Sequence, residues 1–316
     1  MFNMTKRLLI ASTASFTLMA GSAWADGLMS IIVNNPSNPY WFTEGQVAKK
    51  TAEDMGYEAN VSAHKGDTNT ESKLIDTAIT NKAKAIILDP ANADGSIGAV
   101  RKAVAAGIPV IIINAEINQS GLAKAQLVSN NAQGAALGAM QWIESVGDSG
   151  NYVELFGAPS DNNAQTRSNG FKTVLSQYPD LVKVASEVAN WDRTQGYTKM
   201  QSILQANPNI KGVISGNDDM ALGAIAALKE AGKLSQVKVG GFDGSPDAAE
   251  AILNGEMEYT VLQPVATFAA EAIRQADNVI KTGSTGIDSE KQLFDCYLIT
   301  SDNIKYYTSA FTLSKH

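Results

Sequence analysis

Apolar runs of strand length alternate with stretches of helical periodicity over most of this chain. Four such runs occur in its first part, at residues 28–33, 57–63, 85–88 and 109–113. Helical patterns separate them, at residues 40–55, 67–82 and 95–106. The alternation restarts at residues 125–129 and continues to a long helix at 265–281 and a last strand-like stretch at 292–299. This pattern predicts an α/β fold with parallel sheets.

The segment 211–243 shows how polar residues follow the predicted strands. A short apolar run ends at Asn217, Asp218 and Asp219, and a helical pattern then leads to a second strand that ends at Asp243. Ligands of open parallel sheets bind at the carboxyl ends of the strands, so these side chains are candidates for binding. The alternative is that they only cap helices and shape turns, which is the commonest use of Asn and Asp.

The first 25 residues have the order of an export signal. Lys6 and Arg7 precede an apolar run over residues 8–20, and Ala23-Trp24-Ala25 forms a small-x-small end, so we expect cleavage after Ala25. The apolar run is shorter than the roughly 20 residues that a membrane span requires. No Cys lies at the junction, which argues against a lipid anchor.

Composition and charge exclude several classes of partner and site. The chain has 316 residues, which suggests two domains. Without Lys6 and Arg7 it has 23 basic residues against 32 acidic ones, and 23 − 32 = −9, which argues against nucleic acid or an anionic membrane as a partner. A single cysteine, Cys296, and two isolated histidines, His64 and His316, suggest neither an internal disulfide nor a metal site, and no cofactor motif is present.

Four motifs in this chain resemble those of the ribose-type periplasmic sugar-binding proteins of ABC importers, which are related to the ligand domains of LacI-type repressors. They are NPYW at 38–41, AQTRSNGF at 164–171, GNDDMALG at 216–223 and GFDG at 241–244. The resemblance implies a periplasmic protein of the type I binding-protein fold, with two Rossmann-like lobes joined by a three-strand hinge. The implied first lobe spans residues 27–130 plus 264–291, and the second spans 131–263 plus 292–316.

The resemblance also implies a set of ligand contacts in the cleft between the lobes. The first lobe would contribute Asn38, Tyr40, Trp41, Asp89 and Asn114; the second Arg167, Trp191, Asn217, Phe242 and Asp243; and the hinge Gln263. Sugar hydroxyls both donate and accept hydrogen bonds, which matches the amide, carboxylate and guanidinium groups, while sugar C–H faces pack on aromatic rings. Alternatively, Trp41 and Trp191 are core residues, Arg167 is a surface charge and Gln263 ends a strand.

One departure from the family pattern concerns the end of the fourth strand. Ribose-type members commonly carry Asp-Arg there, whereas this chain has Asn114-Ala115-Glu116. Ala115 cannot replace a guanidinium that forks onto sugar oxygens, which puts a ribose-like ligand in doubt. The remaining polar set favours a neutral ligand rich in hydroxyls: a pentose, a hexose, a linear polyol or a cyclitol.

The expected mechanism is closure of the hinge on the ligand, with no chemical step. The expected partners are the membrane subunits of an ABC importer, or a chemoreceptor as the alternative, and we expect a monomer. An enzyme with Asp89 and Asp243 as acid and base is disfavoured because no nucleophile, metal-ligand or GxGxxG motif accompanies them. A transcription regulator would need a helix-turn-helix module where the export signal stands.

Overall fold

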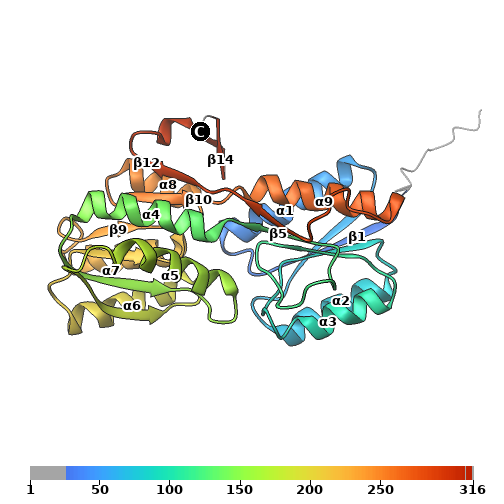
Figure 1. The fold of residues 1–316 in the computed structure, drawn as a ribbon, viewed down its shortest axis with the longest axis horizontal. Helices are drawn as coiled ribbons and strands as arrows, with labels where there is room; N and C mark the ends of the chain where they lie inside the picture. The colour runs from blue at the N-terminus through green and yellow to red at the C-terminus, as the bar shows by residue number, and fades with distance from the viewer. Residues whose placement is uncertain (1–25, 310, 315–316) are drawn as a thin grey trace, which may run out of the picture.

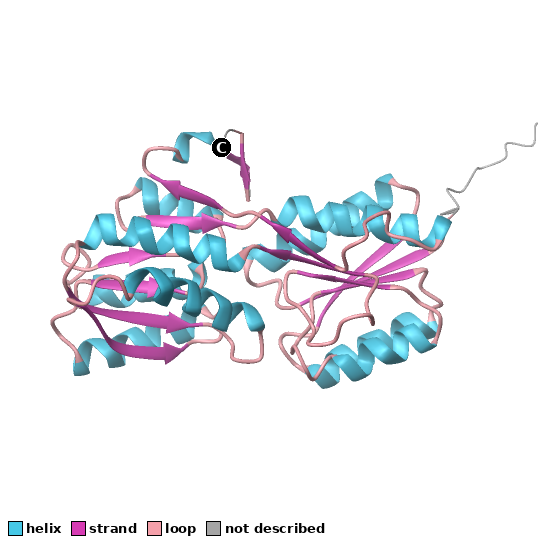
Figure 2. Cartoon of the chain, viewed as in Figure 1, coloured by secondary structure: helices cyan, strands magenta, loops and turns pink. Residues whose placement is uncertain are grey.

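The computed structural model describes residues 26–309 and 311–314 and shows two α/β lobes side by side (Figure 1). Each lobe is built on a six-stranded sheet with helices on both faces (Figure 2). The α/β fold class predicted from the sequence is confirmed. The predicted export signal, residues 1–25, lies outside the described residues.

The sheet of the first lobe is entirely parallel. Its strands follow one another in the order β11 (Lys291–Phe294), β5 (Ala125–Ser129), β4 (Val110–Ile113), β3 (Ala85–Leu88), β1 (Leu28–Val33) and β2 (Glu58–Ala63). Its helices are α1 (Pro39–Asp54), α2 (Thr68–Thr80), α3 (Ile97–Ala105) and α9 (Val265–Thr282). Alternate side chains face opposite sides: Ile31 packs with α1 and α9, whereas Ile32 packs with α2 and α3. Burial on both faces explains why the central strands β3 and β4 are apolar throughout, whereas the edge strands β2 and β11 carry polar and charged residues.

The sheet of the second lobe has the same kind of strand order. It runs β12 (Tyr297–Thr300), β10 (Tyr259–Leu262), β9 (Lys238–Gly240), β8 (Gly212–Ser215), β6 (Gly150–Phe156) and β7 (Leu181–Val188). Only β12 is antiparallel to its neighbour. The helices are α4 (Asn131–Val146), α5 (Asn162–Leu175), α6 (Arg193–Ala206), α7 (Asp218–Glu230) and α8 (Pro246–Leu253). Helices α4 and α5 pack with Tyr152 and Ile214 on one face of the sheet. Helices α6, α7 and α8 pack with Val153 and Val213 on the opposite face.

The chain crosses between the lobes three times (Figure 1). The crossings follow β5 at Asn130, β10 at Gln263 and β11 at Asp295. The predicted single strand at 292–299 and the lobe boundary after residue 291 are therefore wrong. Residues 291–294 pair with β5 in the first sheet, and the chain then enters the second sheet as β12 beside β10. The two halves of one strand-like stretch can join different sheets, because each half belongs to the sheet with which its backbone pairs.

The C-terminal segment was not predicted and adds a short hairpin to the cleft region. After the 3-10 turn Ile304–Tyr306, strands β13 (Tyr307–Ser309) and β14 (Thr312–Leu313) pair antiparallel. The Tyr307 hydroxyl donates to the Gly244 carbonyl at 2.9 Å. Phe311 packs edge-on against Tyr40, with ring centroids 5.5 Å apart. The hairpin therefore supports residues beside the cleft in both lobes.

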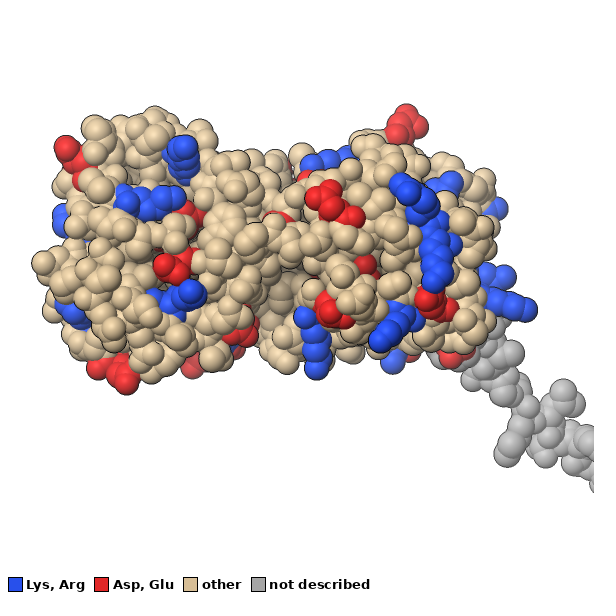
Figure 3. Space-filling model, turned by 90° about the horizontal axis from the view of Figure 1, so that it is seen from below, with Lys and Arg blue, Asp and Glu red and all other residues tan. Residues whose placement is uncertain are grey.

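Charged side chains lie over the surface of both lobes. Figure 3 shows a face of the molecule on which basic and acidic side chains are interspersed. None of the helices within residues 26–309 has the length and apolarity that a membrane span needs.

Candidate ligand-binding site

A small cavity lies between the lobes, where the carboxyl ends of the two sheets face each other. Its volume is about 270 Å³. It is lined by Asn38, Tyr40, Trp41, Asn114, Asp161, Asn163, Arg167, Trp191, Asn217, Asp243 and Gln263. Residues of both lobes therefore meet around one small cavity.

The sequence predicted most of this wall, but not all of it. Phe242 does not line the cavity and lies under Arg167, whereas Asp89 lines the adjoining part of the cleft and accepts from Asn114. Conversely, Asp161 and Asn163 line it and were missed. They follow β6 at the start of α5, just as Asn217 follows β8 at the start of α7. The rule that singled out Asn217 would have identified them had it been applied to that strand.

Several side chains on the wall also cap the helices that begin at the cleft. Asn38 accepts from the Tyr40 N–H at 2.8 Å, Asp161 from the Asn163 N–H at 2.8 Å, and Asn217 from the Met220 N–H at 2.9 Å. The capping role that the sequence left open for Asn217 is therefore real. It does not exclude binding, because capping uses only one oxygen of each side chain and holds the remaining polar atoms in place.

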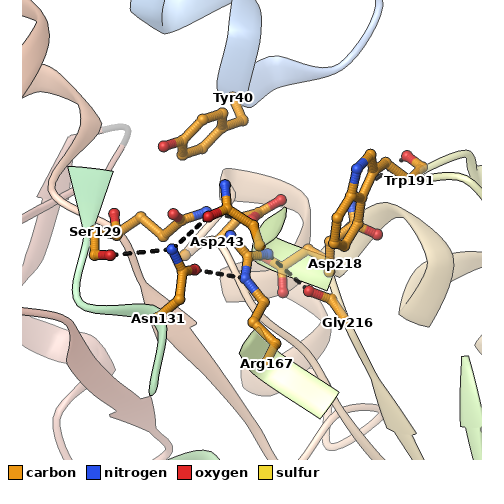
Figure 4. A network of polar contacts seen from close by, with 12 residues as sticks. Tyr40, Ser129, Asn131, Arg167, Trp191, Gly216, Asp218 and Asp243 are labelled. Atoms are coloured by element: carbon orange, nitrogen blue, oxygen red, sulfur yellow. Dashed lines mark hydrogen bonds and ion pairs between the residues drawn. The ribbon is translucent and has the colours of Figure 1, made fainter. Parts of the chain in front are cut away.

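Arg167 projects from α5 into the floor of the cavity (Figure 4). Its Nε donates to Asn131 Oδ1 at 2.7 Å and its Nη1 to the Gly216 carbonyl at 2.8 Å. The guanidinium carbon lies 3.9 Å from the ring centroid of Phe242 and 5.2 Å from that of Trp191. Hydrogen bonds and aromatic stacking thus fix a buried cation in one orientation, as bidentate recognition of a ligand requires.

Asp243 and Gln263 form a polar pair beside Arg167. Asp243 Oδ1 accepts from Gln263 Nε2 at 2.7 Å and lies 3.5 Å from Arg167 Nη1. Burial raises the pKa of Asp243, and the neighbouring guanidinium opposes that shift. Asp243 has a φ of 137°, a backbone conformation that is costly for a residue other than glycine and that concentrates at functional sites. Gln263 Oε1 has no hydrogen-bond partner in the described part of the chain and can accept from a ligand.

Trp191 forms the side wall of the cavity. Its φ of 64° lies in the left-handed region, and its indole covers Gly157 so closely that a Cβ there would be 2.0 Å from the ring. Asn217 Nδ2 donates to the Trp191 carbonyl at 3.4 Å. The indole Nε1 is buried and has no hydrogen-bond partner within residues 26–309 and 311–314. Trp191 therefore offers a ligand a flat apolar face, and its Nε1 lies close to the Asp161 carboxyl.

A hydrogen-bonded chain lies behind the first-lobe side of the cavity. The Tyr40 hydroxyl donates to Asn114 Oδ1 at 3.0 Å, and Asn114 Nδ2 donates to Asp89 Oδ2 at 3.0 Å. Burial raises the pKa of Tyr40, so it remains a neutral phenol. The side chain of Asn114 thus has a protein partner on each polar atom, and the buried Trp41 Nε1 lies close to the Asp89 carboxyl.

The wall combines one cation with two carboxyl groups. Arg167 is its basic residue, and Asp161 and Asp243 are its acids. Burial raises the pKa of Asp161 to about 6. Ala115 is buried away from the wall, and Glu116 forms an ion pair with Lys291 at 2.7 Å, so neither supplies the cation that ribose-type proteins carry near this point. An anionic ligand would therefore meet more negative than positive charge, and a neutral ligand suits the site better.

Direct hydrogen bonds join the lobes across the cleft. The Ala93 N–H donates to the Ser160 carbonyl at 2.9 Å, and Asn162 Nδ2 donates to Asn118 Oδ1 at 2.7 Å. Asn163 Nδ2 donates to the Asn114 carbonyl at 3.1 Å. The structure is therefore a closed form, in which a bound molecule would contact both lobes at once.

The site holds the groups needed for binding rather than for catalysis. Among the described residues, no cluster of His, Cys, Asp and Glu could hold a metal ion. Cys296 is buried, and burial raises the pKa of its thiol to about 12, which leaves it unreactive at neutral pH. What the cavity presents is hydrogen-bond donors and acceptors on a rigid frame with aromatic faces, which is the chemistry of carbohydrate recognition.

Comparison with known proteins identifies the family. The family model described as a periplasmic binding protein domain matches residues 29–285. The chain belongs to this family. This periplasmic binding protein is a sugar-binding or polyol-binding component of an ABC importer and not an enzyme, as predicted from the sequence.

The relatives of this periplasmic binding protein include two D-apiose import binding proteins. That of Actinobacillus succinogenes is 51% identical over 98% of this chain and 100% of its own length. That of Paraburkholderia graminis is 49% identical over 95% of this chain and 96% of its own length. Among solved structures, an ABC transporter periplasmic solute binding protein from Actinobacillus succinogenes with bound D-allose is 30% identical. It has a TM-score of 0.82 and covers 88% of this chain and 99% of its own.

Proposed function

We propose that this periplasmic binding protein captures D-apiose, an uncharged branched pentose, for import. The observation that carries the proposal is the cavity wall, which combines one buried cation with hydrogen-bonding groups and aromatic faces from both lobes. The proposal is supported by two D-apiose import binding proteins that are 51% and 49% identical to this chain over nearly its full length.

Closure of the hinge would supply both affinity and a signal to the importer. The ligand bridges first-lobe groups such as Asn38 to second-lobe groups such as Arg167 and Asp243, so it stabilises the closed form selectively. Hydrogen bonds to charged groups contribute about 1.5–3 kcal/mol each, so a few of them with stacking on Trp191 reach the roughly −8 kcal/mol of micromolar binding. The closed form would then present the surfaces of both lobes to the membrane subunits.

Calorimetry with D-apiose, D-ribose, xylitol and myo-inositol tests the ligand assignment. We expect D-apiose to bind with a Kd of about 1 μM or tighter, and D-ribose at least roughly 100-fold more weakly, because a buried polar group left without its hydroxyl costs binding energy. Equal or tighter binding of D-ribose would refute the assignment of D-apiose while leaving sugar binding intact. Absence of heat with all four compounds would contradict both.

We also propose that the protein is exported to the periplasm. Export with cleavage after Ala25 is supported by the order of the first 25 residues and by the family. Mass spectrometry of the exported protein would give the cleavage site. We also propose that the mature protein is a monomer, which light scattering tests, and that it delivers ligand to an importer. A chemoreceptor is the alternative client.

The hydrogen bonds across the cleft give a separate prediction. Asn162→Ala removes the donor to Asn118, which lies in the other lobe, without changing a residue of the cavity wall. We expect D-apiose affinity to fall about threefold to tenfold, in line with the loss of one hydrogen bond, and to fall through faster dissociation. Stopped-flow kinetics checks this. Asn169→Ala on the same helix, which loses only a contact to Gln165, is the control; an unchanged dissociation rate in Asn162→Ala would be the contrary result.

A further inference from the structure

Beneath the first-lobe side of the cavity lies a buried carboxyl group, that of Glu44 on α1, in addition to the carboxyl group of Asp89. The side chain is fully buried, with an exposed fraction of 0%. No N–H or O–H donor of the described residues reaches either of its oxygens. The group that does come within hydrogen-bonding reach is the carboxyl of Asp89, which is itself 1% exposed. Two groups that accept hydrogen bonds when ionised thus face each other in the protein interior.

Among the residues that the structure describes, no basic side chain forms an ion pair with Glu44 or Asp89. The basic side chains of α1 and α9 lie in exposed ion pairs with acids of their own helices: Lys49 with Glu53, Lys50 with Asp54, Arg274 with Glu271 and Lys281 with Asp277. The other titratable neighbours are Tyr40, a neutral phenol, and Asp161, which adds negative potential at Asp89.

His64, near Asp89, is uncharged too. Its Nδ1 accepts from the Gly66 N–H at 3.0 Å, and its Nε2 lies 2.7 Å from the Asp89 carbonyl. A ring that accepts on Nδ1 must carry its proton on Nε2 alone, so the imidazole is neutral and donates to the backbone. Burial lowers its pKa in agreement.

We infer that Glu44 is a neutral carboxylic acid whose O–H donates to the Asp89 carboxylate, so that the pair holds one proton and one negative charge. Two adjacent buried carboxyl groups without a cation cannot both ionise, and a shared proton turns their repulsion into a hydrogen bond. Burial and the Asp89 charge both raise the pKa of Glu44 well above its ordinary range.

Through this proton Glu44 acts as a positioning residue for the binding site. Asp89 accepts from Asn114, and Asn114 accepts from Tyr40, so the pair anchors a chain that ends at two residues of the cavity wall. Loss of the proton would place a second negative charge next to Asp89 and push the two carboxylates apart. Ligand affinity should therefore fall as the pH rises above the pKa of Glu44.

Infrared difference spectroscopy and thermal unfolding test the proton without any ligand. Glu44→Gln should remove a carboxylic-acid C=O band that wild-type protein shows at pH 7. A folded-state pKa raised above its unfolded value of about 4.3 means that the stability from this group is lost as the pH rises. Glu44→Gln escapes that loss, so its Tm relative to wild type should increase from pH 4 to pH 8 by roughly 3 °C or more.

The control is Glu71→Gln, a second buried glutamate of the same lobe. Glu71 Oε2 accepts from the Ala91 N–H at 2.7 Å and from the Ser96 hydroxyl at 3.0 Å, so this carboxyl group, unlike that of Glu44, is held by protein donors. Glu71→Gln should keep the carboxylic-acid band assigned to Glu44 and should have a lower Tm than wild type. An unchanged infrared band in Glu44→Gln, together with a Tm difference independent of pH, would show that Glu44 is ionised and overturn the inference.

A binding experiment tests the positioning role and rests on the proposed function. D-apiose affinity of the wild type should fall by about tenfold or more between pH 6 and pH 9, whereas Glu44→Gln, which keeps a donor toward Asp89, should hold its affinity over that range. Parallel pH profiles would overturn the role. If D-apiose fails to bind either protein, the proposed ligand is wrong, and the infrared and unfolding results still decide the inference.

Discussion

Replacing Arg167 with alanine is expected to abolish D-apiose binding. The guanidinium is the cation of the cavity wall and lies 3.5 Å from Asp243, which is buried beside it. Hydrogen bonds to a charged group contribute about 1.5–3 kcal/mol each, so the loss of two such bonds to the ligand corresponds to a loss of roughly 100-fold or more in affinity. Calorimetry at ligand concentrations up to about 1,000 times the wild-type Kd would measure it.

The control for this prediction is Arg274→Ala. Arg274 is an exposed arginine of the first lobe whose ion pair with Glu271 lies on the surface of α9. Its replacement should leave D-apiose affinity within about twofold of wild type, because surface ion pairs contribute little. Far-ultraviolet circular dichroism should show both variants folded. D-apiose affinity within tenfold of wild type in folded Arg167→Ala would remove Arg167 from the site.

Replacing Gly157 with alanine is expected to reduce binding by at least about 100-fold, although Gly157 itself is not on the cavity wall. A Cβ at this position would lie 2.0–2.3 Å from three carbon atoms of the Trp191 indole, a separation that no packing tolerates. The ring must leave its place over the strand end, and the cavity then loses its aromatic wall. Calorimetry measures the affinity, and tryptophan fluorescence should shift as the indole moves.

The control is Gly98→Ala on α3. A Cβ at that position meets no atom within 4 Å, and alanine favours a helix more than glycine does. This variant should bind D-apiose as wild type does and be as stable or more stable. Trp191→Ala should reproduce the loss of binding of Gly157→Ala if the indole is the cause. Full binding by Gly157→Ala would show that Trp191 has no part in holding the ligand.

Much of the cleft could be predicted because it is built from local signals. Asn38, Asn217 and Asp243 each follow an apolar strand, and parallel strands bring their carboxyl ends to one edge. The same reasoning applied to β6 would have added Asp161 and Asn163. Phe242 could not be separated from the wall by sequence, because it shares a motif with Asp243 and only packing places it under Arg167. Asp89 lines the adjoining part of the cleft, and its role in binding stays a prediction.

The last strands show the limit of local signals most clearly. Residues 292–299 form one apolar stretch, yet β11 and β12 belong to different sheets. The short C-terminal hairpin escaped prediction because a few residues carry too little periodicity for a pattern to emerge. Its position depends on contacts of Tyr307 and Phe311 with residues far away in the chain.

The sequence by itself determined the alternation of strands and helices, the capped helix starts and the polar residues at strand ends, because periodicity and capping act between neighbours in the chain. Only the tertiary structure decided which of these residues meet. Arg167 stacks on Phe242, the Trp191 ring covers Gly157, and Glu44 faces Asp89 because the hinge and the packing of each lobe bring distant segments together. Charge and hydrogen bonding between such groups depend on separations of a few ångströms, which no local pattern encodes.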